Sequence, residues 1–115
     1  MSKHDPTIRL LHMRDFARKA LQLTEGKTQA DLERDEVLRL AVTHLLELVG
    51  EAAGRVPLDI QAKYPAIPWP KIVSMRNRLI HGYDDVDYAI LWDALTLNLP
   101  PLLKELESAI GAGRE

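Results

Sequence analysis

The sequence predicts an all-α protein, an antiparallel up-and-down bundle of four main helices in which the last helix is kinked. Apolar residues recur at intervals of three and four over most of the 115 residues, which is the spacing of one helix face. No strand-like alternation extends beyond a few residues. Aromatic residues make up only 5% of a chain that is 46% hydrophobic, which favours aliphatic helices over a β sandwich. By length, residues 1–115 form a single domain, with flexible ends expected at residues 1–4 and 111–115.

The first helix is expected from about Asp5 to Glu25. Pro6 suits the first turn of a helix, and Gly26 suits the end of one. The apolar face of this helix consists of Ile8, Leu11, Phe16, Ala17, Ala20 and Leu21. A polar connector, GKTQADLERD, follows it.

The second helix, which emerges near Glu33, carries the clearest apolar stripe of the sequence. The stripe comprises Val37, Leu38, Ala41, Val42, Leu45, Leu48, Val49 and Ala52. His44 lies on the same stripe and is expected to be a packed, hydrogen-bonded core residue rather than a ligand. Gly50 costs such a helix about 0.5–1 kcal/mol relative to alanine, and the close approach of another helix would offset that cost.

The segment after this helix is expected to form an ordered corner. Gly54 and Pro57 end the helix, just after a modest surface pair of Glu51 with Arg55. One short helical turn is predicted from about Leu58 to Lys63. The apolar anchors of the corner are Ile60, Tyr64, Ile67 and Trp69.

The third helix, predicted from Lys71 to about Ile80 with Pro70 in its first turn, carries an arginine where a core residue is expected. Around this helix, Ser74, Asn77, Arg78 and His81 share one flank, whereas Ile72, Val73, Met75, Leu79 and Ile80 share the other. Arg76 falls near the middle of the apolar flank. Because burying an unpaired guanidinium costs several kcal/mol, Arg76 must face an anion, a partner surface or a water-filled cleft.

The fourth helix is predicted from about Val86 to Ile110, with Asp84 or Asp85 as its N-cap. Its apolar face consists of Ile90, Leu91, Ala94, Leu95, Leu102, Leu106 and Ile110. Pro100 and Pro101 must kink or split this helix, because they remove two backbone donors and clash with the preceding turn.

Composition and motifs exclude several classes of protein. The chain has no cysteine, which excludes disulfide frameworks, thiolate zinc sites and cysteine nucleophiles. No apolar run follows the opening residues or approaches a membrane-spanning length, so the cytoplasm is the expected location. Neither a GxxxxGK[ST] nor a GxGxxG phosphate loop is present, and the serines lack a nucleophile elbow.

No metal site is expected either. The histidines are His4, His12, His44 and His81, and they form no HExxH or HxH pattern. Helix capping explains Asp84, Asp85 and Asp87 more simply than a hard cation does.

Positive charge is concentrated around the third helix. Between Arg55 and His81 five basic residues accompany a single acidic one, in a chain of net charge −2. Four acidic residues follow directly: Asp84, Asp85, Asp87 and Asp93. On charge alone, an ordinary mixed-charge surface explains this distribution equally well.

Arg76 and His81, with Asn77 beside the arginine and Tyr83 beyond the histidine, have the chemistry for phosphodiester cleavage without a metal. Histidine can accept or deliver a proton near neutral pH. The planar guanidinium of arginine matches phosphate oxygens and stabilises developing negative charge. RNA carries its own nucleophile, the 2′-hydroxyl. An R-x4-H string is common by chance, and a surface histidine beside an arginine paired with a nearby aspartate is the simpler alternative.

The context of this string resembles the HepT-like family of the HEPN superfamily. The similar stretches are VGEAA at 49–53, YPAIPWPKIVSMRNRLIHGYDDVD at 64–87 and LWDALTLNLPPL at 91–102. Members of the family are small all-α proteins with the signature R-x4-H-x-Y, which here falls on Arg76, His81 and Tyr83. The resemblance runs from about Asp5 to Ile110 and is densest from Pro65 to Asp93. The double proline is a slight departure, outside the motif.

This resemblance implies a function. Family members are homodimers in which two copies of the motif line one cleft, and they act as metal-independent endoribonucleases with no cofactor of their own. They serve as toxins of toxin–antitoxin pairs. The antitoxin is a nucleotidyltransferase of the MNT type that transfers AMP from ATP onto the signature tyrosine, here Tyr83. Some HEPN relatives are instead non-catalytic nucleotide- or partner-binding modules, which is the alternative for this chain.

From the chemistry of the site residues and the implied dimer, we expect a specific role for each of them. His81 would transfer the proton for attack by the 2′-hydroxyl, Arg76 would stabilise the phosphorane, and Asn77 would orient the phosphate or the histidine. RNA contacts or support are expected from Lys71, Arg78 and Tyr83.

The dimer that the resemblance implies fits the helix geometry. Arg76 and His81 point about 140° apart around a straight helix, so one protomer alone makes a poor site. Unwinding at Gly82 could bring the histidine round, and a partner helix would supply the second set of residues. A purely structural four-helix dimer, whose motif pairs with Asp84 or Asp87, is a further alternative.

Overall fold

The computed structural model describes residues 7–81 and 87–113, and every regular element within these ranges is a helix. In chain order they are α1 (Thr7–Thr24), α2 (Gln29–Arg34), α3 (Glu36–Gly54), α4 (Leu58–Lys63), α5 (Trp69–His81), α6 (Tyr88–Asp93), the π-helix η1 (Ala94–Asn98) and α7 (Leu99–Gly113). The prediction of an all-α protein is confirmed. None of these helices is both long and apolar enough to cross a membrane.

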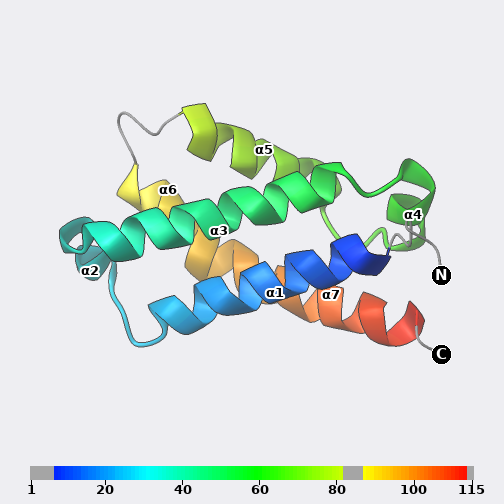
Figure 1. Cartoon of the computed structure of the whole chain (residues 1–115), viewed down its shortest axis with the longest axis horizontal. Coiled ribbons are helices and arrows are strands. Elements are labelled where there is room, and N and C mark those ends of the chain that lie inside the picture. Colours follow the sequence, from blue (N-terminus) through cyan, green and yellow to red (C-terminus); the bar gives the residue numbers. More distant parts are fainter. Residues whose placement is uncertain (1–6, 82–86, 114–115) are drawn as a thin grey trace.

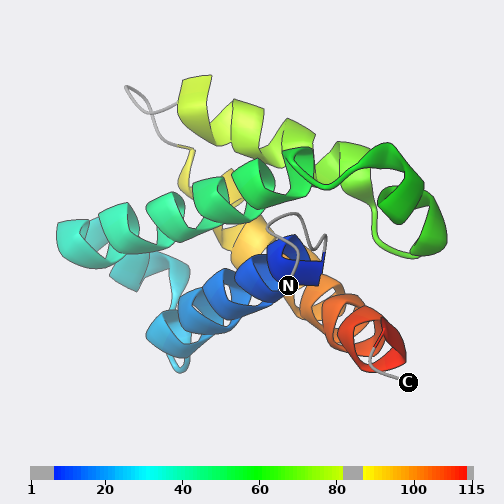
Figure 2. The same cartoon turned by 45° about the vertical axis from the view of Figure 1, so that its right-hand side comes forward.

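The long helices pack around α3. Figures 1 and 2 show α3 between α5 and α1, with consecutive long helices running in opposite directions and α7 lying along α1. The core between them is aliphatic. Its largest fully buried side chains are Leu10, Met13, Leu32, Val42, Leu46, Val49, Leu91, Leu95, Leu99 and Leu106. The long helices α1, α3 and α7 all contribute side chains to this core. The core holds α3 in place, and α5 packs on α3.

The first helix ends close to its predicted position. The last residue of α1 is Thr24, and Gly26 follows with a φ of +74°, a conformation that glycine adopts without the steric cost of a Cβ atom. The hydroxyl of Thr24 donates to the carbonyl of Ala20, which closes the last turn.

The polar connector contains a helix that the sequence analysis did not predict. Thr28 caps α2 by accepting from the backbone of Asp31, whose carboxylate accepts in turn from the backbone of Thr28. This reciprocal capping box stabilises a helix of only six residues, which buries Leu32. As a result α3 begins at Glu36 rather than near Glu33, with Asp35 accepting from the backbone of Leu38.

Two predictions for the stripe on α3 are wrong. His44 is exposed rather than packed in the core, and its Nδ1 lies 3.9 Å from a carboxylate oxygen of Glu47. Val37 is 78% exposed, whereas Leu46, which the predicted stripe omitted, is fully buried. The buried arc is rotated because α3 packs against α1 on one side and α5 on the other, so its centre lies nearer Leu46 and Val49 than His44.

The corner after α3 is formed as predicted. The helix ends at Gly54, α4 provides the short helical turn, and Arg55 pairs with Glu51 at 2.8 Å. Trp69 is buried, and its indole N–H donates to the carbonyls of Gln61 and Tyr64 at 3.2 Å. These two bonds tie the corner to the first residue of α5.

The predicted last helix changes to π-helical geometry next to its prolines, while the backbone stays helical from α6 into α7. Pro100 and Pro101 occupy the first turn of α7 and cannot donate to the carbonyls four residues earlier, and the chain runs through the π-helix η1 directly before them. The N-cap of α6 is Asp87, whose carboxylate accepts from two backbone N–H groups. Asp84 and Asp85, predicted as caps, lie outside the described residues.

Two smaller corrections concern the same segment. Ile90 was placed on the apolar face but is 37% exposed, because α6 is short and covers only part of the core. The C-terminal helix continues to Gly113, three residues beyond its predicted end at Ile110.

Candidate functional site

The side chain of Arg76 lies in the contact between α3 and α5. A Cβ atom added at Gly50 would overlap Cβ of Arg76 and would lie 3.0 Å from its Cγ and Cδ. One turn further along α3, a Cβ atom added at Gly54 would lie 4.0 Å from Cγ2 of Val73. The residue numbers rise along α3 from Gly50 to Gly54 while those of their contacts on α5 fall from Arg76 to Val73, so the two helices are antiparallel. The shorter contacts at Gly50 show that the helices lie closer together there than at Gly54. The predicted close approach of another helix at Gly50 is confirmed.

This packing explains how an arginine occupies the apolar flank of α5. Its aliphatic stem covers the backbone of α3 at Gly50, as the stems of long basic side chains often cover apolar surface. The neighbours of Arg76 on the same flank, Ile72, Met75 and Leu79, are buried in the core. The sequence located the glycine and the arginine separately, but it gave no signal that the two residues contact each other.

The Nε atom of Arg76 is shielded from solvent and has no hydrogen-bond partner among residues 7–81 and 87–113. A buried N–H without an acceptor costs about 1–3 kcal/mol, so an acceptor arriving there gains more than a new surface hydrogen bond would. The hydroxyl of Thr43 is likewise buried and has no hydrogen-bond partner among the described residues. Thr43 precedes Gly50 by two turns on the same face of α3, so both unsatisfied atoms lie along the side of α3 that meets α5.

The regular geometry of α5 separates the two motif residues. The helix is continuous from Trp69 to His81, so successive side chains keep their helical spacing and positions 76 and 81 stay about 140° apart. Asn77, next to the arginine, is exposed. The side chain of His81, and Tyr83 as a whole, lie outside what the structure describes.

Lys71 and Arg78, predicted to support RNA binding, line a groove on the other side of α5. The groove has a volume of about 900 Å³ and lies between α5 and the segment formed by η1 and α7. Its apolar part includes Ile72, Met75, Leu97, Leu99 and Leu102, and its polar part includes Lys71, Ser74, Arg78, Asn98 and Glu105. Arg76 does not line this groove. The basic residues of α5 are thus divided between its two sides.

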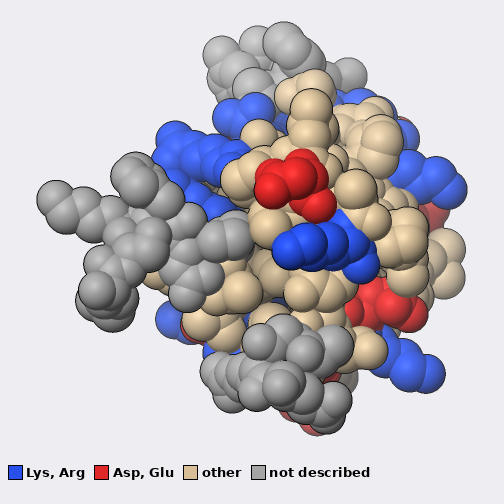
Figure 3. All heavy atoms as spheres, turned by 90° about the vertical axis from the view of Figure 1, so that its right-hand side faces the viewer, with Lys and Arg blue, Asp and Glu red and all other residues tan. Residues whose placement is uncertain are grey.

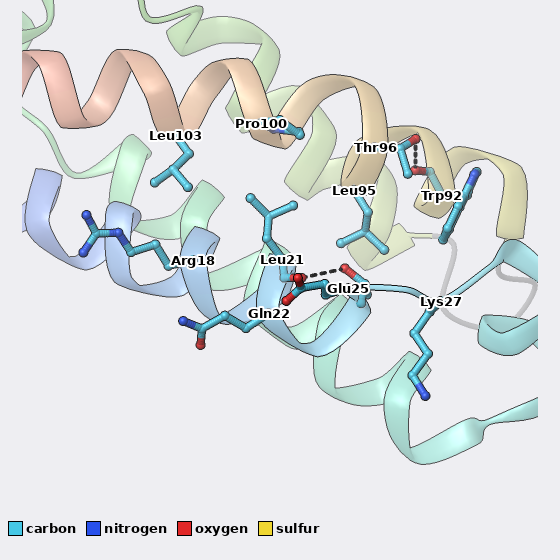
Figure 4. Close-up of a pocket in the computed structure, with 11 residues that line it drawn as sticks. Arg18, Leu21, Gln22, Glu25, Lys27, Trp92, Leu95, Thr96, Pro100 and Leu103 are labelled. Atoms are coloured by element: carbon cyan, nitrogen blue, oxygen red, sulfur yellow. Dashed lines mark hydrogen bonds between the residues drawn. The ribbon is translucent and has the colours of Figure 1, made fainter.

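A second cavity, of about 690 Å³, lies between α1 and the π-helix (Figure 4). It is lined by Arg18, Leu21, Gln22, Thr24, Glu25, Lys27, Trp92, Leu95, Thr96, Pro100 and Leu103. Arg18 is already paired with Glu107 at 2.6 Å, and the hydroxyl of Thr96 donates to the carbonyl of Trp92. None of the described side chains of the R-x4-H motif borders this cavity.

The basic residues of α5 have no direct salt-bridge partner among the described residues, although Glu105 lines the same groove as Lys71 and Arg78. Lys71, Arg76 and Arg78 form no ion pair with any other residue in the described ranges. At the end of the molecule that carries α4, where α5 also begins, basic and acidic side chains are interspersed (Figure 3). Within residues 7–81 and 87–113, no group of three or more histidine, aspartate and glutamate side chains is placed to hold a metal ion.

Comparison with known proteins identifies the family. A family model described as ribonuclease HepT-like matches residues 13–109. A provisionally named RNase of Methanocaldococcus jannaschii is 32% identical over 110 residues, which cover 96% of this chain and 91% of that protein. A second such RNase of the same organism is 33% identical over 107 residues, or 93% of this chain and 98% of its own length.

A relative from another organism carries the family's name. The protein of Thermococcus cleftensis that is provisionally named ribonuclease HepT is 34% identical over 100 residues, covering 84% of this chain and 90% of its own length. No solved structure is significantly similar to the chain. The family match spans α5 and the α3 residues that contact it, and on this basis the chain belongs to the ribonuclease HepT-like family.

Proposed function

We propose that this chain is a metal-independent endoribonuclease that works as a homodimer and serves as the toxin of a HEPN/MNT toxin–antitoxin pair. The observation that carries the proposal is the state of Arg76. Its stem is fixed against α3 and its Nε is buried without a partner, in a helix whose last residue is His81. The names of the relatives, which are those of RNases, support the same activity.

The chemistry needs only proton transfer and charge stabilisation. His81 takes the proton from the 2′-hydroxyl of RNA, which attacks the adjacent phosphate and forms a 2′,3′-cyclic phosphate as the 5′-oxygen leaves with a proton from water. Arg76 donates to the phosphate oxygens, where negative charge grows in the transition state. Asn77, exposed beside it, orients the phosphate. No metal enters this reaction.

A second protomer completes the site. Since positions 76 and 81 lie about 140° apart around one helix, a phosphate that contacts the arginine of one protomer is better placed for the histidine of the other. Two basic α5 helices facing one cleft also increase the positive potential where a polyanion must lie.

The sequence position of Tyr83 supports regulation by a nucleotidyltransferase. Tyr83 is two residues beyond His81, and its phenol is the proposed acceptor of AMP from ATP, which the MNT-type antitoxin supplies. An added AMP brings bulk and negative charge next to the motif. It would therefore compete with RNA for Arg76.

The test is RNA cleavage by the purified chain in the presence of EDTA. His81→Ala and Arg76→Ala should each reduce the rate, the histidine change by about 10²- to 10⁴-fold if His81 acts as general acid or base. Matched controls are His44→Ala and Arg55→Ala, which remove an exposed histidine and an exposed arginine of the same protein. These controls should cleave like the unaltered chain.

Two other outcomes would argue against the proposed ribonuclease activity. Equal cleavage by all variants indicates a contaminating nuclease and removes the support for an enzyme. Absence of cleavage combined with nucleotide binding would favour the alternative, a non-catalytic binding module that works with a nucleotidyltransferase.

A further inference from the structure

We infer that Gly50 is a positioning residue for Arg76, and that the absence of a side chain at position 50 holds the guanidinium where RNA cleavage needs it. This inference rests on the proposed ribonuclease function. The glycine touches no reacting atom, because it acts only through the arginine packed on it.

The geometry at Gly50 leaves no room for a substitution. An added Cβ would overlap Cβ of Arg76, and this atom cannot move unless the backbone of α5 moves with it. The same added atom would lie 3.0 Å from Cγ and Cδ, which a rotamer change could move, but no rotamer change moves Cβ and relieves the overlap. A side chain at position 50 must therefore push α5 away from α3 at Arg76.

The neighbouring glycine on the same face shows that this requirement is local. At Gly54 an added Cβ would stand 4.0 Å from Cγ2 of Val73, which is an ordinary van der Waals distance. Both glycines lie in α3 and face α5, and alanine at either position lowers the backbone entropy of the unfolded chain. Gly54→Ala is therefore a matched control that adds the same methyl group to the same helix pair without displacing Arg76.

The residue that packs on Gly50 is Arg76, and this identity indicates that the contact does more than bring two helices together. If the glycine only allowed two helices to approach, a buried aliphatic residue such as Met75 would serve at the crossing point. Instead the crossing residue is the motif arginine, whose Nε is buried and unpartnered among the described residues. A donor fixed in this way is preorganised for an incoming phosphate oxygen, and small displacements of such groups reduce rates strongly.

The experiment compares Gly50→Ala with Gly54→Ala in single-turnover RNA cleavage, together with RNA binding and the ¹⁵N resonance of the Arg76 Nε–H group. Gly50→Ala should lower kcat by about 10²-fold, as expected for a misplacement of about 1 Å, while KM and RNA affinity stay near their original values. The Nε–H resonance should shift in Gly50→Ala alone. Gly54→Ala should match the unaltered chain in every measurement.

If Gly50→Ala folds poorly, a double-mutant cycle that measures the free energy of unfolding tests the inference instead. Arg76→Gly removes the Cβ, Cγ and Cδ atoms that the alanine would meet. Adding Gly50→Ala to Arg76→Gly should therefore lower the free energy of unfolding less than adding it to the unaltered chain does.

Three results would overturn the inference. One is unchanged kcat in Gly50→Ala, another is an unshifted Arg76 resonance, and the third is an equal loss of stability by Gly50→Ala whether or not Arg76 is present. If the unaltered chain does not cleave RNA, the proposed function fails separately. The resonance and the double-mutant cycle then still test whether Gly50 positions Arg76.

Discussion

The guanidinium of Arg39 lies over the ring of Tyr88, with its Cζ atom 5.4 Å from the ring centroid. The same group donates from Nη1 to the carbonyls of Leu32 and Glu33, both at 3.0 Å. Arg39 therefore joins three elements: it belongs to α3, it satisfies two carbonyls near the end of α2, and it holds the first residue of α6. The beginning of α6 is the point at which the described chain resumes after the motif.

Replacing Arg39 should weaken this junction. Arg39→Ala removes two charge-assisted hydrogen bonds and a cation–π contact, and we expect the free energy of unfolding to fall by about 1–3 kcal/mol. Arg39→Lys keeps the charge but not the planar group, so it should recover only part of the loss. Urea denaturation measures both. An alanine variant as stable as the unaltered chain would show that α2 and α6 are held by their buried leucines alone.

The capping box of α2 should make stability depend on pH in acid. The backbone N–H of Thr28, and then its hydroxyl, hold the pKa of Asp31 below its usual value of 3.8, with Arg34 and Lys27 adding to the effect. Because the folded pKa is lowered, the carboxylate stabilises the fold above pH 3.8. This contribution is lost as the pH falls through 3.8 toward the lower folded pKa.

Thermal unfolding between pH 2 and 6, a range about two units either side of the usual aspartate pKa, tests this sign. Asp31→Asn should unfold at a lower temperature than the unaltered chain at the upper end of the range, and the two curves should converge at the lower end. Glu33→Gln removes one negative charge from the same helix without the cap, and it controls for charge alone. A constant difference across the range would contradict the prediction.

The division of basic residues around α5 predicts two kinds of effect on RNA. Lys71→Ala and Arg78→Ala should weaken RNA binding and reduce its dependence on salt, because each lost phosphate contact lowers the slope of log K against log salt by about 0.7 for a single strand. Arg76→Ala should mainly lower kcat, since its stem is packed against α3 and its role is in the transition state. Filter binding at several salt concentrations, combined with cleavage assays, separates the two. Equal effects on binding from all three changes would place Arg76 with the other basic residues.

Helical spacing was enough to predict the all-α class, but not which side of each helix is buried. The proline pair at 100–101 correctly marked where the last helix departs from α-helical hydrogen bonding, because the loss of backbone donors is a local property of the sequence. His44 was misplaced because the buried arc of α3 depends on two partners, α1 and α5, whose positions no local pattern contains. The contact of Gly50 with Arg76 joins residues far apart in the chain. Only the packed structure reveals it.

The proposed antitoxin chemistry predicts one modified residue. With ATP and an MNT-type nucleotidyltransferase, the unaltered chain should gain the mass of AMP on Tyr83 and lose RNA cleavage. Tyr83→Phe should gain no mass and should remain active in the presence of the antitoxin. Tyr88→Phe, altered five residues away, serves as the control and should be modified normally. Intact-mass and peptide mass spectrometry locate the group, and modification of Tyr83→Phe would assign another acceptor.

A shared site predicts that two inactive variants restore each other. Arg76→Ala and His81→Ala each lack one group, but a mixed dimer contains one intact arginine and one intact histidine, on different protomers. Since positions 76 and 81 lie about 140° apart around one α5, the productive pair is expected across the dimer, and mixing the variants should restore one of its two possible sites. Random exchange places about half of the protomers in mixed dimers, and each mixed dimer regains one of its two sites. The expected activity is therefore roughly a quarter of that of the unaltered protein.

Subunits are exchanged under mild denaturation, and the cleavage activity of the mixture is compared with that of each variant treated alone. If mixing restores nothing although sedimentation shows exchanged dimers, each site draws both groups from a single chain, and the arrangement of α5 around a shared phosphate is wrong.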